Sequence, residues 1–223
     1  MSSKITSGNT RPSQTLNSGT KRSQAKLDKK SAIMKAALEL FSRHGVKGTR
    51  VEKIAALAKV SKTNLLYYFK SKEQLYIEVM QQLLQVWLAP LASFNEEQDA
   101  VETIKDYIRV KLELSRDHPA ESRLFCMEML HGAPLLEEQL KLPLKELVDS
   151  KAMVINAWIK AGKIAPVDPY HLIFTIWSTT QHYADFRIQI ESITNNSLDD
   201  PAFFKSTLNN LQNIILQGVQ PSQ

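Results

Sequence analysis

The amino-acid sequence predicts an all-α fold with two domains. Apolar residues recur at three- and four-residue spacing through most of the chain, and no stretch keeps the two-residue alternation of a half-buried strand. Breaks that contain proline or glycine divide this pattern into segments of helical length. The 223 residues are enough for a small N-terminal domain and a larger domain with its own hydrophobic core.

Charge is distributed unevenly along the chain. Residues 1–30 carry seven Lys or Arg and one acidic residue, residues 31–72 carry nine and two, and residues 73–223 carry twelve and twenty. Positive potential is therefore confined to the N-terminal third, as expected for a domain that binds a polyanion such as DNA. A protein that binds a membrane surface could share this asymmetry.

The first segment, residues 1–26, is an arm of mostly polar residues. It has too few apolar side chains to offset the entropy cost of ordering, so we expect it to be disordered. Basic residues at its end would either reach DNA or only keep the chain soluble: Lys21, Arg22, Lys26, Lys29 and Lys30. The sequence leaves both interpretations open.

A first helix is predicted over residues 29–44, where apolar side chains lie at helical spacing. Gly45 can end it in the left-handed conformation. Two short helices follow. An apolar stripe runs from Val51 to Ala58, with Thr49 placed to cap it, and Ser61 is the candidate N-cap of a helix over residues 62–69. Only two residues separate these helices, so they must cross steeply, as in a helix-turn-helix.

The second short helix has the polar face that contact with a DNA major groove requires. Its hydroxyl, amide, aromatic and basic side chains can reach phosphates and base edges. The charge of Lys72, in the first turn of the next helix, opposes the helix dipole, so we expect a phosphate to compensate it. The candidate DNA-binding residues are Thr49, Ser61, Lys62, Thr63, Asn64, Tyr67, Tyr68 and Lys72. A small helical bundle that binds no DNA is the alternative.

Several residues of this stretch form a specific pattern: Phe41, Gly45, Gly48-Thr49, Ile54-Ala55, Ala58, Val60-Ser61-Lys62, Leu65, Tyr67-Tyr68-Phe69 and Ser71-Lys72-Glu73-Gln74-Leu75. In these residues the stretch resembles the N-terminal domain of the TetR family of transcriptional regulators. Thr63 and Leu66 depart from the family pattern, which often has a glycine and an aromatic residue there, and this bears on operator preference. The resemblance implies a helix-turn-helix DNA-binding domain over residues 27–72 and a ligand-binding and dimerisation domain over residues 73–223.

Further helices are predicted beyond residue 72, and proline and glycine set most of their limits. The expected ranges are 71–89, 100–116, 120–131, a segment from about 135 to 160 that starts anew or kinks at Pro143, 171–186 and 201–217. We expect the helices at 168–187 and 201–217 to form the interface of a homodimer. The helix from Ser71 to Pro90 is long enough to link the two domains mechanically.

The segment over residues 171–186 combines apolar residues around its circumference with several polar ones, and buried polar groups need partners. Trp177, Gln181 and Asp185 are spaced to share one face, with Phe174 and Ser178 beside them. An indole beside a primary amide suits a small planar heterocycle, because the ring packs on the indole and the amide offers a donor and an acceptor. Internal hydrogen bonds or a dimer contact are the alternative, and Met127 is a candidate for the pocket wall.

A narrower resemblance rests on SRDHPAESRLFCMEMLHGAPLL at 115–136 and APVDPYHLIFTIWSTTQHYADF at 165–186. These segments are similar to pyrimidine-responsive members of the TetR family. The similarity implies a repressor that binds a palindromic operator in double-stranded DNA as a homodimer. It also implies a small-molecule effector, uracil or thymine, that releases the DNA.

Other classes of protein find little support in the sequence. It contains no nucleophile elbow, phosphate-binding loop, dinucleotide motif or HExxH, so no catalytic residue and no cofactor are predicted. The histidines lack metal-ligand spacing, so no metal is predicted. One cysteine, no signal peptide and no membrane-spanning segment favour a cytoplasmic protein. Two alternatives stay open: a regulator of a different effector, or a constitutive DNA-organising protein without a ligand.

Overall fold

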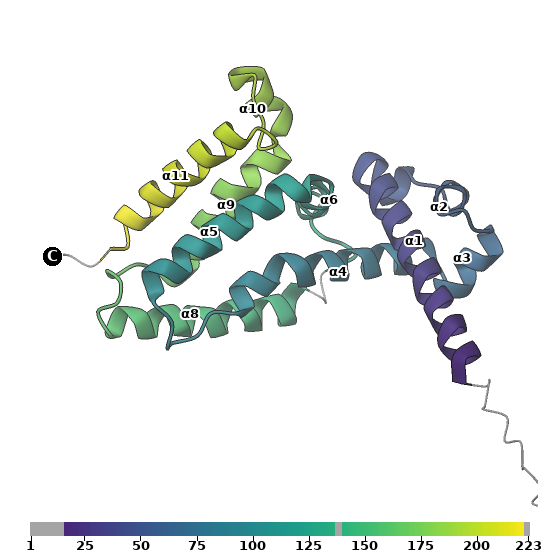
Figure 1. Cartoon of the computed structure of the whole chain (residues 1–223), viewed down its shortest axis with the longest axis horizontal. Coiled ribbons are helices and arrows are strands. Elements are labelled where there is room, and N and C mark those ends of the chain that lie inside the picture. Colours follow the sequence, from purple (N-terminus) through teal and green to yellow (C-terminus); the bar gives the residue numbers. More distant parts are fainter. Residues whose placement is uncertain (1–15, 137–139, 221–223) are drawn as a thin grey trace, which may run out of the picture.

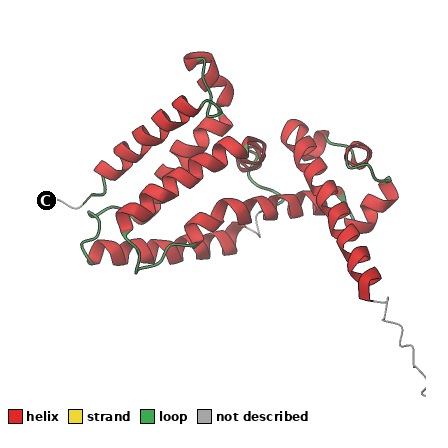
Figure 2. Ribbon diagram, in the orientation of Figure 1, coloured by secondary structure: helices red, strands yellow, loops and turns green. Residues whose placement is uncertain are grey.

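The computed structural model describes residues 16–136 and 140–220, and every regular element within these ranges is helical (Figure 2). The predicted all-α fold is confirmed. The elements in chain order are α1 (Leu16–Gly48), α2 (Val51–Leu57), α3 (Lys62–Tyr68), α4 (Lys72–Ala92), α5 (Ala100–Asp117), α6 (Pro119–Leu130), the short π-helix η1 (Leu140–Leu144), α8 (Lys145–Lys160), α9 (Pro169–Asp185), α10 (Arg187–Thr194) and α11 (Pro201–Gln217).

Helix α1 begins at Leu16, well before the predicted start near Lys29. The expected disorder of residues 1–26 is therefore not met over residues 16–26, and residues 1–15 lie outside the described part of the chain. Short-range contacts rather than an apolar core support this exposed extension, since the Gln24 amide donates to Asp28 one turn later at 2.9 Å. Gly45 has φ 64°, outside the helical region, as predicted for the residue that breaks the first helix.

The N-terminal domain is built on a buried cluster contributed by α1, α2, α3 and the start of α4. Its centre consists of side chains with no exposed surface: Ile33, Ala37, Phe41, Ile54, Leu65, Phe69 and Leu75. The Ser61 hydroxyl accepts a hydrogen bond from the Asn64 amide at 3.1 Å, so Ser61 is the N-cap of α3 as predicted. Helices α2 and α3 lie beside α1, at the right of Figure 1.

Helix α4 passes from this domain into the C-terminal one (Figure 1). Ser71 caps it by accepting from the Gln74 amide at 3.1 Å. The helix was expected to stop before Pro90, but it continues to Ala92. A proline this close to a helix end removes one backbone hydrogen bond without preventing the last turn, which the Ser93 amide closes on the Ala89 carbonyl at 3.2 Å.

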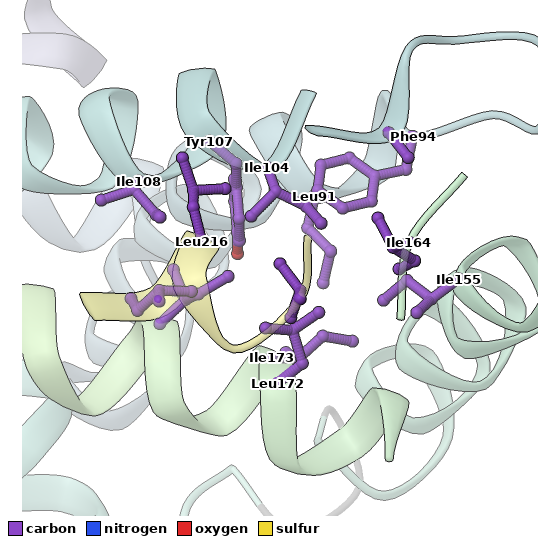
Figure 3. Close-up of a cluster of buried hydrophobic side chains, with 14 of the residues drawn as sticks. Leu91, Phe94, Ile104, Tyr107, Ile108, Ile155, Ile164, Leu172, Ile173 and Leu216 are labelled. Atoms are coloured by element: carbon purple, nitrogen blue, oxygen red, sulfur yellow. The ribbon is translucent and has the colours of Figure 1, made fainter. Parts of the chain in front are cut away.

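The C-terminal domain packs α5, α8, α9 and α11 around a second apolar cluster (Figure 3). Trp158, Ile104 and Ile173 are almost completely buried there. Tyr107 lies inside the same cluster with its ring edge against Phe94, the centroids being 5.2 Å apart. Helix α10, which has no buried residue, was not predicted, because nothing in its pattern requires one face to be covered.

Candidate DNA-binding surface and effector cavity

Helix α3 presents polar side chains to solvent on the face opposite Leu65 and Phe69. Lys62, Thr63 and Tyr67 are exposed on it, and Tyr67 is the most exposed aromatic residue of the domain at 72%. Its ring meets that of Tyr68 edge to face at 5.4 Å, and the ammonium of Lys26 on α1 lies 5.5 Å from its centroid. Charge and hydrogen-bonding capacity therefore gather around one projecting ring.

An ion pair joins the two crossing helices beside this ring. The Lys62 ammonium lies 2.6 Å from the Glu52 carboxylate, and this hydrogen bond is the main reason that the pKa of Glu52 is lowered. Both side chains are more than half exposed, so the pair can exchange for contacts with a phosphate at little cost. Asn64 is half-buried and bound through its main chain to the Ser61 cap.

Two predictions about Thr49 and Lys72 need correction. Thr49 does not cap α2, whose N-cap is Arg50, because its hydroxyl donates within the protein to the carbonyls of Gly45 and Leu40 at 2.8 and 3.2 Å. Thr49 is only 2% exposed, so its side chain is not placed for direct contact with DNA. The Lys72 ammonium donates to the Thr49 carbonyl at 3.1 Å, so a protein group, not only a phosphate, compensates its charge.

The second candidate site is a small cavity in the C-terminal domain. Trp177 and Gln181 of α9 line it together, as their spacing predicted. Helices α4, α5 and α6 contribute Trp87, Lys111 and Ser122 to the wall, and Leu144 of η1 also lines it. The cavity measures about 30 Å³, which is room for about two water molecules. It must widen before it can hold a planar ring.

A hydrogen bond from the core fixes the indole of Trp177. Its Nε1 donates to the Tyr107 hydroxyl at 2.6 Å, and burial raises the pKa of Tyr107, so this phenol stays neutral at physiological pH. Phe174 lies on the other side of Trp177, with ring centroids 5.9 Å apart, and it is 49% exposed. It contacts the indole but does not line the cavity.

Three other predicted ligand residues lie away from the cavity wall. The Asp185 carboxylate accepts from the Ser122 hydroxyl at 2.5 Å, so it joins α9 to α6, and burial raises its pKa. The Ser178 hydroxyl is exposed and donates to the Thr175 carbonyl at 3.1 Å. Met127 lines a different, larger cavity of about 600 Å³ between α6 and the N-terminal domain.

Sequence reasoning missed Lys111, which is 2% exposed. Its ammonium lies 4.2 Å from the ring centroid of Trp87, and no described residue forms a hydrogen bond or ion pair with it. Burial lowers its pKa to about 7, while the charge of Asp185 acts in the opposite direction. Its position in the sequence could have indicated this burial, because Lys111 follows Ile104 by seven residues and Ile108 by three, and so lies on the apolar face of the predicted 100–116 helix.

Trp87 was also missed, because its place in the apolar pattern of α4 explains it as ordinary core. It is 4% exposed, and its indole N–H has no hydrogen-bond partner among the described residues. An unpaired buried donor costs about 1–3 kcal/mol. Among the described residues, neither this N–H group nor the Lys111 ammonium has a hydrogen-bond acceptor.

Two further findings bear on other functions. Within residues 16–136 and 140–220, no group of three or more potential ligand side chains could hold a metal ion. In the same ranges no helix combines the length and apolarity needed to cross a membrane.

Comparison with known families and proteins covers almost the whole chain. Residues 33–79 match the family described as bacterial regulatory proteins, tetR family, and residues 80–222 match the YcdC-like protein C-terminal region. The HTH-type transcriptional regulator RutR of Escherichia coli O157:H7 is 58% identical over 201 residues, which are 90% of this chain and 95% of that protein. The repressor NicS of Pseudomonas putida is 28% identical over 67% of this chain and 70% of its own length.

Solved structures of lower identity share the fold. AibR in complex with isovaleryl coenzyme A and operator DNA is 19% identical, with a TM-score of 0.65 over 85% of this chain and 99% of that one. The fatty acid degradation regulator FadR from Bacillus halodurans is 19% identical, with a TM-score of 0.62 over 84% and 94%. The chain belongs to the TetR family and is a helix-turn-helix transcriptional regulator.

Proposed function

We propose that this regulator is a cytoplasmic repressor that binds a palindromic operator as a homodimer and is released by uracil or thymine. The observation that carries the choice of effector is the cavity shared by Trp177 and Gln181. The indole offers a flat apolar surface, and the amide offers a donor and an acceptor to a ring with adjacent N–H and C=O groups. The resemblance to pyrimidine-responsive regulators supports the same class of ligand.

The small size of the cavity supports an induction mechanism. A ring that does not fit the present 30 Å³ can bind only to a state in which the surrounding helices have moved apart. Trp87 belongs to this wall, and it lies on α4, the helix that also supplies Leu75 to the core of the N-terminal domain. Widening the cavity would therefore displace a helix on which the DNA-binding domain is built.

A second connection runs through α6. Ser122 of this helix lines the cavity, and Glu128, two turns later, accepts a buried hydrogen bond from the Tyr76 hydroxyl of α4 at 2.6 Å. The Tyr76 ring packs edge to face on Phe41 of α1, with centroids 5.2 Å apart. A shift of α6 would reach α1 and α4 together, and so change the separation of the two α3 helices in a dimer.

Exposed apolar side chains on the last three helices support the dimer. A monomer gains nothing by exposing such residues, whereas a partner subunit would cover them. They are Phe174 on α9, Ile188 and Ile193 on α10, and Ile214 on α11. Two copies related by a twofold axis would then present their α3 helices to successive major grooves.

Thermal unfolding with a panel of pyrimidines tests the choice of effector. A ligand that binds only the folded state adds RT ln(1 + [L]/Kd), about 2.7 kcal/mol at 100 times Kd. Uracil or thymine should raise Tm in the wild-type protein and much less in the Gln181→Ala variant, with adenine as an unrelated ring. Equal effects of all rings, or none, would contradict the proposed effector and leave a different ligand or a constitutive DNA-binding protein.

A further inference from the structure

Lys111 occupies the cavity wall at a cost that the fold alone does not explain. It lies on α5 among largely apolar neighbours, is 2% exposed, and its ammonium lies 4.2 Å from the centroid of the Trp87 ring. A buried ammonium with no hydrogen-bond or ion-pair partner among the described residues is unfavourable, and a methionine would fill the same space. Such a group is retained where a ligand supplies the missing partner.

The donors of the wall define what that partner must offer. The Lys111 ammonium can only donate, whereas Gln181 can both donate and accept. A ligand that satisfies both residues needs one N–H group and at least two acceptor oxygens in the plane of a flat ring. A cyclic imide, with a carbonyl on each side of an N–H group, has this arrangement, whereas an aminopyrimidine replaces one acceptor by a donor.

We propose that Lys111 is a specificity-determining residue of this cavity and donates a hydrogen bond to a carbonyl oxygen of a planar cyclic imide, while Gln181 binds the adjacent N–H and second carbonyl. This inference rests on the proposed function, because uracil and thymine belong to that class. It adds the residue that binds one of the two carbonyl oxygens of the imide.

Binding should then place a proton on Lys111. An ammonium is a stronger donor to a carbonyl than a neutral amine, so the ligand raises the pKa of Lys111 above its value of about 7 in the free protein. Asp185 of α9 is the described charged group that acts on Lys111, and burial raises the pKa of Asp185. Cys126 of α6, whose pKa burial raises, lies against Asp185, and α4 contributes Trp87 and aliphatic residues to this wall.

Calorimetry on the wild-type protein measures this proton directly. Uracil is titrated at pH 7.5 in phosphate and in Tris, which differ in ionisation enthalpy, and the difference gives the number of protons taken up. We expect about 0.7 proton per site, and an affinity that falls roughly twenty-fold between pH 6.5 and 8.5. An uptake of zero, with uracil bound, would overturn the inference.

Variants and truncated ligands identify the contact. Lys111→Met should weaken uracil binding about ten-fold or more and abolish the proton uptake, whereas Lys105→Met, on the exposed face of α5, should change neither. Pyrimidin-2-one and pyrimidin-4-one each lack one carbonyl of uracil. In the wild-type protein each of these ligands should bind more weakly than uracil. In Lys111→Met, one of the two should bind as tightly as uracil, because the oxygen that it lacks is the one that Lys111 contacts.

The outcomes separate this inference from the proposed function. If the wild-type protein binds no uracil or thymine, both fail. If it binds them and Lys111→Met binds them equally well, only the role of Lys111 fails. The same holds if Lys111→Met still loses affinity when either carbonyl is removed from the ligand. Operator binding without ligand and the circular dichroism spectrum establish that each variant is folded.

Discussion

Replacing Tyr76 with phenylalanine should destabilise the protein at the junction between its two domains. The Tyr76 hydroxyl donates to the Glu128 carboxylate at 2.6 Å, and these residues are only 2% and 6% exposed. Without the hydroxyl, Glu128 keeps one weaker hydrogen bond among the described residues, from the Leu135 amide at 3.3 Å. A hydrogen bond to a charged group contributes about 1.5–3 kcal/mol, so a loss of about 2 kcal/mol should lower Tm by about 4–8 °C for a chain of this length.

Thermal unfolding followed by circular dichroism measures this effect, with Glu128→Gln as the matched control. The glutamine keeps an acceptor for the Tyr76 hydroxyl, so its Tm should fall less than that of Tyr76→Phe. The same junction connects α6 to α4 in the proposed mechanism, and Tyr76→Phe should therefore need more uracil to release operator DNA. A Tm within about 1 °C of the wild type would refute the assigned strength of this contact.

Three further changes have distinct expected results. Tyr67→Ala removes the most exposed ring of α3 and should weaken operator binding about ten-fold in an anisotropy titration, with uracil affinity unchanged. Operator binding equal to that of the wild type would exclude Tyr67 as a contact. Gln181→Ala should lower uracil affinity about ten-fold or more by calorimetry, whereas Ser178→Ala, outside the cavity, should not. An equal loss of uracil affinity in the two variants would contradict the assignment of the cavity as the binding site. Because the pKa of Lys111 is near 7 in the folded state and about 10.4 when unfolded, the unfolded chain binds more protons between these values and stability should rise with pH there. Urea unfolding at pH 7 and 9 should show this rise in the wild type and not in Lys111→Met.

Local features of the fold could be predicted from the sequence. The cap at Ser61, the break at Gly45 and the pairing of Trp177 with Gln181 each depend on residues within one or two turns of each other. The start of α1 could not, because its first turns have no apolar stripe that distinguishes them from a disordered arm.

The composition of the cavity depends on how α4, α5, α6, η1 and α9 come together, which spacing within one helix does not determine. Met127 was expected at the cavity, but it is five residues from Ser122 on α6, which places the two side chains about 140° apart around the helix axis. Lys111 was missed for the complementary reason. Its burial depends on α4, α6 and α9 covering that side of α5.

Operator release in a single titration tests the central claim that a ligand bound by Trp177 and Gln181 of α9 controls DNA binding. Fluorescence anisotropy of a labelled operator, bound by wild-type protein or by Gln181→Ala, is followed as uracil is added. The wild-type complex should dissociate, and the variant complex should remain bound at the same uracil concentrations. A wild-type complex that persists at saturating uracil, or release of both complexes at one concentration, would contradict the claim.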